Sequence, residues 1–222
     1  RNVTGVQTCA LPISAAIRRG HLRVRTLVTL RWLVIGGQVA LLSTMAFALG
    51  YRAPYYLCAV VVAAGAFVNV LTAVASPPQR VMGDNEAVGQ LSLDVLQMSL
   101  LLGLIGGSAN PFILILLAPV TLAAATLPLR PLLILAALAS ILSMALAFFT
   151  LPYPSVHPEP RLSLEFRLAA GVANVAGIAL VAGYVRQSVV EAARMALALD
   201  VTQTVLAREQ KLSALEALAA AA

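Results

Sequence analysis

The heptapeptide GGSANPF, residues 106–112, is the stretch of this sequence whose residue types and spacing best suit ligand binding. Asn110 is a good helix N-cap, and Pro111 fits the first helical position because its missing N–H would have no partner there. Backbone N–H groups at a helix start attract acceptor oxygens, and the ring of Phe112 can stack on a flat molecule. A quinone offers two carbonyl oxygens and a planar ring, so the heptapeptide is a candidate quinone-binding site.

The same residues also fit a capped turn that binds nothing. Gly106 and Gly107 can take the left-handed conformations that end a helix, and Asn110 and Pro111 can begin the next one. This structural interpretation leaves Phe112 unexplained. The two interpretations are compatible because a cap would fix the geometry that a site requires, so both stay open.

The elements that must position this heptapeptide are membrane helices. The chain has 222 residues, 60% of them hydrophobic and 11% charged, with a mean hydropathy of +0.91. A soluble domain of this length could not bury so much apolar surface. Because the apolar runs are continuous, without strand-like alternation, we predict an all-α polytopic membrane protein, a six-transmembrane-helix bundle followed by a cytoplasmic signalling helix. The predicted spans are about 27–49, 54–76, 89–105, 110–129, 131–151 and 166–186.

Basic residues follow membrane topology rather than forming a nucleic-acid surface. The formal net charge is +6, and the arginines gather before the first span, after the last and in alternate loops. The positive-inside rule therefore places both termini in the cytoplasm and the 106–112 and 152–165 loops in the periplasm. No stacking aromatics accompany these arginines, so nucleic acid is not an expected partner. The basic residues on the expected cytoplasmic side are Arg18, Arg19, Arg23, Arg25, Arg80, Arg130, Arg186, Arg194, Arg208 and Lys211.

Four segments are expected along the chain. Residues 1–14 match nothing that follows in composition, and we interpret them as a non-native or artefactual tail. A cytoplasmic N-terminal segment, 15–26, precedes the transmembrane sensor domain, 27–186. Residues 187–222 are expected to form a truncated cytoplasmic helix that dimerises and links to a further domain; an amphipathic helix on the lipid surface is the alternative. Its apolar stripe consists of Val201, Val205, Leu212, Leu215 and Leu218.

Polar residues within the predicted spans have two possible roles. Asp94 lies about one turn inside the third span, where a structural partner such as Arg31 is favoured over a proton relay. The uncharged polar residues are expected to hold helices together by hydrogen bonds. They are Gln38, Asn69, Gln97 and Asn174.

The sequence contains no catalytic or metal-binding constellation. Cys58 falls inside the second span and Cys9 in the N-terminal tail, so neither a disulfide nor a metal site is expected, and Cys58 is interpreted as a small packed residue. His21 and His157 are expected to be ordinary solvated side chains, since neither has a nearby cysteine or acidic cluster. No nucleotide-binding or hydrolase motif is present.

GGSANPF resembles the GGxxNPF heptapeptide of the RegB/PrrB family of redox-responsive sensor histidine kinases, which includes the ActS proteins. The match comprises Gly106, Gly107, Asn110, Pro111 and Phe112. It lies where the family has it, between the third and fourth of six membrane spans. The start of the first span, RVRTLVTLRWLVIGGQ (23–38), is similar to the opening helix of the family with its Arg-Trp pair, and 211–222 resembles the lead-in to the phosphoacceptor histidine. The resemblance covers nearly all of the chain from about residue 18.

This resemblance implies a multi-pass protein of the bacterial inner membrane that binds ubiquinone at those five residues and so reads respiratory redox state. In the family, the sensor tunes ATP-dependent autophosphorylation of a histidine and transfer to a response regulator, and a homodimer is expected. The chain departs from the family in stopping before the phosphoacceptor histidine and the ATP-binding domain, and in lacking the redox-active cytoplasmic cysteine.

Two other functions compete with the sensor hypothesis. A purely structural membrane anchor would dimerise its kinase without sensing anything. A small-solute transporter would need a polar pathway through the bilayer, which Asp94, Asn69 and Asn174 would supply if they converged in space. We rank the sensor above the anchor, and the anchor above the transporter.

Overall fold

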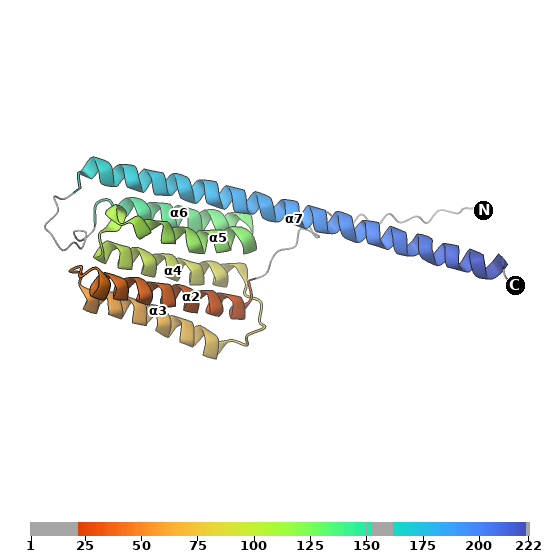
Figure 1. Ribbon diagram of the computed structural model, residues 1–222, viewed down its shortest axis with the longest axis horizontal. Coiled ribbons are helices and arrows are strands. Elements are labelled where there is room, and N and C mark those ends of the chain that lie inside the picture. Colours follow the sequence, from red (N-terminus) through yellow and green to blue (C-terminus); the bar gives the residue numbers. More distant parts are fainter. Residues whose placement is uncertain (1–21, 150, 152–161, 221–222) are drawn as a thin grey trace. The chain divides into compact units, whose positions relative to one another are not determined.

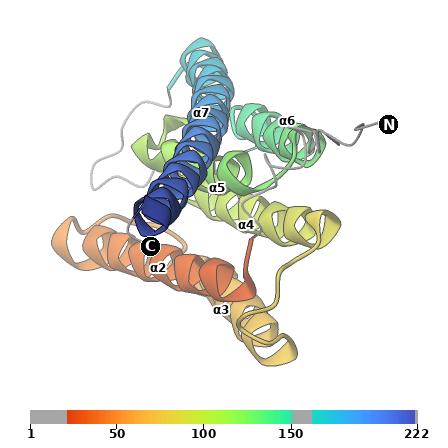
Figure 2. The same cartoon turned by 90° about the vertical axis from the view of Figure 1, so that its right-hand side faces the viewer.

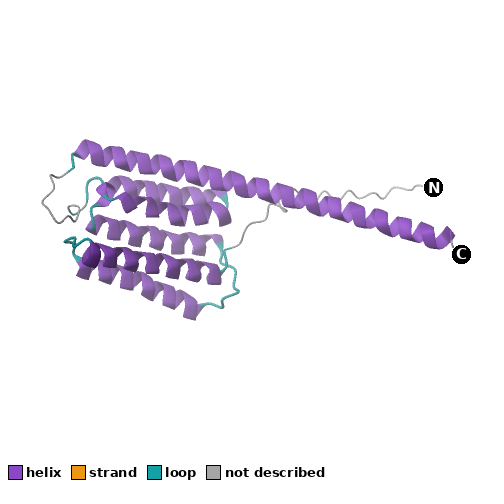
Figure 3. Ribbon diagram, in the orientation of Figure 1, coloured by secondary structure: helices purple, strands orange, loops and turns teal. Residues whose placement is uncertain are grey.

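The computed structural model describes residues 22–149, 151 and 162–220. Within these ranges every named element is a helix, which confirms the predicted all-α class (Figure 3). The described residues up to Val185 belong to one compact unit and those from Arg186 to another. The predictions for the 1–14 tail, Cys9, His21 and His157 fall outside the described residues.

Each of the six predicted spans corresponds to a helical region (Figure 1). The regular helices are α2 (Val24–Ser43), α3 (Tyr55–Ala75), α4 (Asp84–Leu104), α5 (Leu117–Thr126), α6 (Leu129–Ala145) and α7 (Leu164–Ala220). A π-helical turn, η1 (Thr44–Ala48), extends α2, and two 3-10 segments, η2 (Gly107–Ala109) and η3 (Pro111–Leu116), precede α5. The helix α7 continues through residue 186, where the sixth span was expected to end.

Among the described residues, four helical regions are long and apolar enough to cross a membrane: Val24–Ala48, Tyr55–Ala75, Asp84–Leu104 and Leu164–Gln210. Pro111–Thr126 and Leu129–Ala145 are shorter. The first of these gains length from its 3-10 start and extends about 27 Å, and the second about 25 Å. Both fall slightly short of the hydrocarbon core of about 30 Å, so the count of six spans stays a prediction.

The helix α4 occupies the centre of the bundle. Figure 2 shows it between the α2–α3 pair and the α5–α6 pair, and it contacts α3, α5 and α6. Its side chains Leu91, Val95, Met98 and Leu102 are at most 4% exposed and belong to the main hydrophobic core. Because α4 leads directly into residues 106–112, the heptapeptide is anchored to the central helix of the bundle.

The start of α2 is held by the connection between α3 and α4. The N–H groups of Val24 and Arg25 donate to the carbonyls of Arg80 and Pro78 at 3.1 Å each. The N–H of Met82 donates to the Leu22 carbonyl at 2.9 Å. These bonds satisfy helix-start donors that have no partner within the helix, so the loop and the first helix form one structural unit.

Interhelical hydrogen bonds confirm the expected role of the uncharged polar residues. Asn69 Nδ2 on α3 donates to the Val28 carbonyl on α2 at 3.1 Å. Asn174 Nδ2 on α7 donates to Ser143 Oγ on α6 at 2.8 Å, and both side chains are buried. Each bond joins a different pair of helices, as expected where apolar contacts alone do not fix helix pairing.

Candidate functional site

The turn between α4 and η3 is built by its two glycines. Gly106 has φ +112° and Gly107 has φ +58°, both in the region that side-chain-bearing residues rarely adopt. They end α4 and turn the chain into the short η2 segment. The predicted left-handed helix ending at these two positions is therefore confirmed.

Asn110 closes the turn with both ends of its side chain. Its Oδ1 accepts from the N–H of Phe112 at 2.9 Å, which confirms the predicted N-cap, with Pro111 at the first helical position. Its Nδ2 donates to the carbonyl of Ile105 at 2.8 Å, within the last turn before the glycines. The side chain is 1% exposed, so one buried carboxamide ties the end of α4 to the beginning of η3.

The backbone donors around this cap are already in use. Besides the bond from Phe112, the N–H of Asn110 donates to Gly107 and that of Ile113 to the carbonyl of Asn110. The sequence-based expectation of free N–H groups at this helix start therefore does not hold for these three residues. A carbonyl ligand would need its donor elsewhere in the turn.

Three side chains of the heptapeptide take no part in the hydrogen bonds of the cap. The ring of Phe112 is 44% exposed, and Pro111 beside it is also exposed. Ser108 is buried, and its Oγ has no hydrogen-bond partner among the described residues. The turn thus combines an exposed aromatic face with one unsatisfied hydroxyl, a role for Ser108 that the GGxxNPF pattern does not indicate.

A second polar cluster lies on α4, about three turns before the heptapeptide. Arg31 Nε of α2 donates to Asp94 Oδ1 at 2.6 Å, so the predicted partnership of these residues is confirmed. The two other guanidinium nitrogens of Arg31 donate to Gln90, one to Oε1 at 2.7 Å and one to the backbone carbonyl at 2.6 Å. The buried guanidinium thus has an acceptor for each of its three nitrogens, on one carboxylate, one carboxamide and one backbone carbonyl.

Close approach of α3 to α4 is possible because residue 65 is a glycine. A Cβ on Gly65 would lie 2.6 Å from the carboxamide atoms of Gln97. That carboxamide donates from Nε2 to Gln38 Oε1 at 3.1 Å, which links α4 to α2. Gly65 therefore leaves room for a bond that joins the centre of the bundle to its first helix.

Substitution of Gly65 by alanine should displace Gln97 and break its bond to Gln38. We expect a loss of about 1 kcal/mol in stability, the net worth of one such bond, because a flexible side chain can move away from the clash. Denaturant unfolding of the chain in detergent would measure it. Gly36→Ala is the matched control, since nothing lies within 4 Å of a Cβ there; equal effects of the two changes would contradict the assignment.

The remaining polar and nucleophilic side chains do not form a reactive site. Cys58 is fully buried as a free cysteine, as expected for a packed residue. The described residues contain no group of three or more acidic, histidine or cysteine side chains placed to hold a metal. Asp94, Asn69 and Asn174 each have partners on separate helix pairs, an arrangement that favours structural roles over a shared transport path.

Comparison with known proteins gives the chain its relatives. A sensor histidine kinase RegB of Cereibacter sphaeroides is 38% identical to it over 204 residues, covering 90% of this chain and 44% of the relative. The chain is a homologue of the N-terminal part of RegB. A second RegB of the same species is 39% identical over 82 residues, 37% of this chain and 18% of that protein. No family model and no solved structure matches the chain.

The chain spans less than half the length of these RegB relatives. The chain is therefore similar to the N-terminal part of a sensor histidine kinase, and its long apolar helices fit a multi-pass membrane region. Within the described structure, the capped heptapeptide keeps the Phe112 side chain at the surface.

Proposed function

We propose that this chain is the redox-sensing region of a two-component histidine kinase in the bacterial inner membrane, and that it binds ubiquinone at Gly106, Gly107, Asn110, Pro111 and Phe112. The main observation behind the proposal is that two residues of the turn have different roles. Asn110 fixes its shape from within, while the Phe112 ring stays at the surface. The homology to RegB supports the class of protein.

In this proposal the quinone ring lies against Phe112, since flat rings stack or pack edge to face with aromatic side chains. Ser108 Oγ is buried and has no partner in the described structure, so in this proposal the turn shifts on binding and its hydroxyl then donates to a quinone carbonyl. The glycines let the chain approach the ring without a Cβ in the way. Pro111 and Asn110 hold the aromatic residue at a fixed place in the turn.

Redox discrimination follows from hydrogen-bond chemistry. Quinone carbonyls only accept, whereas quinol hydroxyls donate as well as accept, so the redox state of the ligand changes its hydrogen-bond complementarity to the site. One mismatched hydrogen bond is worth about 0.5–1.5 kcal/mol, a bias of several-fold to about tenfold. Binding at two sites in a homodimer would sharpen this modest bias.

The difference between the quinone-bound and quinol-bound states would be transmitted to the kinase along α7, one continuous helix from Leu164 to Ala220. We place both termini in the cytoplasm and the heptapeptide in the periplasm. A small shift or rotation of α7 would then alter ATP-dependent autophosphorylation in a following kinase domain and phosphotransfer to a response regulator.

Phe112→Ala should weaken binding of ubiquinone-1 to the purified chain by about fivefold to tenfold, the value of an aromatic pair beyond its area, with little change in unfolding. Ser108→Ala should also weaken binding, and because the lost hydroxyl has no partner it should not destabilise the protein. Equilibrium binding in lipid nanodiscs measures both effects.

The matched control is Phe67→Ala, an exposed aromatic on α3 that lies in another part of the sequence. It should leave the affinity for ubiquinone-1 unchanged. If Phe112→Ala and Ser108→Ala both bind ubiquinone-1 as tightly as the unchanged chain, the site lies elsewhere.

A further inference from the structure

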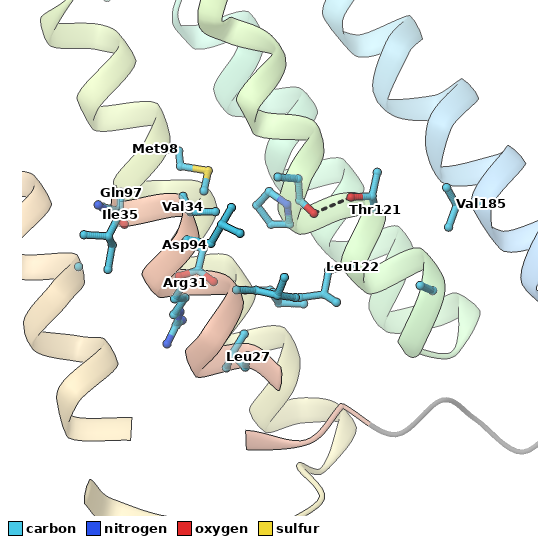
Figure 4. Close-up of a pocket in the computed structure, with 17 residues that line it drawn as sticks. Leu27, Arg31, Val34, Ile35, Asp94, Gln97, Met98, Thr121, Leu122 and Val185 are labelled. Carbon is cyan, nitrogen blue, oxygen red and sulfur yellow. Dashed lines mark hydrogen bonds and ion pairs between the residues drawn. The ribbon is translucent and has the colours of Figure 1, made fainter. Parts of the chain in front are cut away.

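A cavity of about 490 Å³ lies between α2, α4 and α5, away from the heptapeptide. Figure 4 shows Arg31, Asp94 and Gln97 at its wall, opposite Thr121 and Leu122 of α5. Most of the lining is apolar, and no residue of the 106–112 turn contributes to it. A cavity of this size with few polar groups has the character of a site for a small organic molecule.

Two oxygen atoms at this wall have no hydrogen-bond partner among the described residues. Arg31 engages Oδ1 of Asp94, and no hydrogen bond to Oδ2 is present in the described part of the chain. Gln97 uses its Nε2 to reach Gln38, while its Oε1 has no partner among the described side chains. Neither oxygen is among the buried unpaired atoms, and both residues line this cavity.

The charge balance of the wall limits the ligand to a neutral molecule. Arg31 and Asp94 are paired, with side-chain exposures of 7% and 14%, and the surrounding walls are aliphatic. A further charge would have no partner and would lose its hydration, which is costly in an apolar cavity. A neutral donor such as a hydroxyl can instead bond to the free oxygen of a carboxylate that is already paired.

We propose that this cavity binds a neutral, lipid-soluble ring compound that bears a hydroxyl group, and that the hydroxyl donates to Asp94 Oδ2. The apolar part of the ring contacts Leu27, Leu30 and Leu122. Gln97 Oε1 is a second acceptor for a molecule that carries two donors. This site is separate from the proposed quinone site, because no residue of the 106–112 turn lines the cavity.

A matched pair of probes tests the hydroxyl preference on the unchanged chain. 2-Naphthol has the donor, and 2-methoxynaphthalene has the same ring system without it. Binding to the chain in nanodiscs, corrected with empty nanodiscs, should be at least about tenfold tighter for 2-naphthol, as expected for a hydrogen bond to a charged acceptor. Equal affinities would overturn the proposal.

Cavity-filling variants locate the probe. Ala125→Leu and Ala118→Leu add bulk at two lining positions of α5 and should each lower 2-naphthol affinity at least fivefold. Ala63→Leu, an exposed position on α3 outside the lining, should not. Unchanged affinity in folded Ala125→Leu and Ala118→Leu proteins would refute the assignment.

The same probe separates this inference from the proposed function. Phe112→Ala should leave 2-naphthol binding intact even though it weakens ubiquinone-1 binding. If Phe112→Ala abolishes 2-naphthol binding, the probe occupies the turn, and the cavity assignment is wrong while the quinone site stands.

Discussion

Replacement of Arg31 by leucine should lower the free energy of unfolding by about 3–5 kcal/mol, the largest effect we expect from any single change in this chain. Arg31 is 6% exposed and donates three hydrogen bonds, one to Asp94 and two to Gln90. Its loss leaves the carboxylate of Asp94 buried without a counter-charge. Denaturant unfolding in detergent, followed by circular dichroism, measures the change.

An exposed ion pair supplies the control for this prediction. Arg80 bonds to Glu86 at 2.9 Å, with side-chain exposures of 47% and 34%. Exposed pairs contribute about 0–1 kcal/mol, so Arg80→Leu should have a small effect. The double change Arg31→Leu with Asp94→Leu should recover most of the stability, since two apolar side chains can replace a buried pair at little cost. If Arg31→Leu costs no more than Arg80→Leu, the cluster is not a structural centre.

Asn110→Ala should cost about 2–4 kcal/mol and, in the same protein, reduce ubiquinone-1 affinity more than Phe112→Ala does. The change removes a helix cap and leaves the carbonyl of Ile105 buried without its donor, and these losses are each worth about 1–2 kcal/mol. Binding suffers as well, because the position of Phe112 depends on the cap. Thermal unfolding and ubiquinone-1 titration of one preparation measure both.

Asn110→Ser separates the effect of the N-cap bond with Phe112 from the effect of the bond to Ile105. Serine is a good N-cap but is too short to reach the carbonyl of Ile105, so the variant should lie between the unchanged chain and Asn110→Ala in stability. A result in which Asn110→Ser is as unstable as Asn110→Ala would show that the bond to Ile105 dominates. Full stability of Asn110→Ala would contradict the structural role of this side chain.

Much of the architecture is predictable from local sequence. Continuous apolar runs mark all six helical regions, and the two glycines and the Asn-Pro pair mark the turn, because these features depend on backbone conformation and neighbouring residues. Boundaries were less accurate. The predicted third span begins at 89, whereas α4 begins at Asp84, where Asp84 and Glu86 in its first turn favour the helix start. Because the first turn of α4 is polar, the apolar pattern of the sequence begins later than the helix does.

The features that the sequence does not reveal depend on tertiary contacts. The pairing of Arg31 with Asp94 could be predicted because both residues lie at a similar depth in their predicted spans. The bonds from Arg31 to Gln90 depend on how α2 and α4 are rotated relative to each other, which the sequence does not show. Asn110 was recognisable as a cap through its Oδ1; its bond to Ile105 requires the specific reversal that the left-handed glycines create. The nearby N–H groups are hydrogen-bonded because the chain winds as a 3-10 helix after Asn110. No pattern in the sequence predicts this winding.

That winding has a mechanical consequence. Pro111–Leu116 is a six-residue 3-10 segment, longer than most such runs. Rewinding it as α-helix would shorten it by about 3 Å and rotate everything after it by about 120°. Phe112 lies within this segment, so a ligand that favoured the α-helical winding would move α5 along its axis and rotate it in the same step.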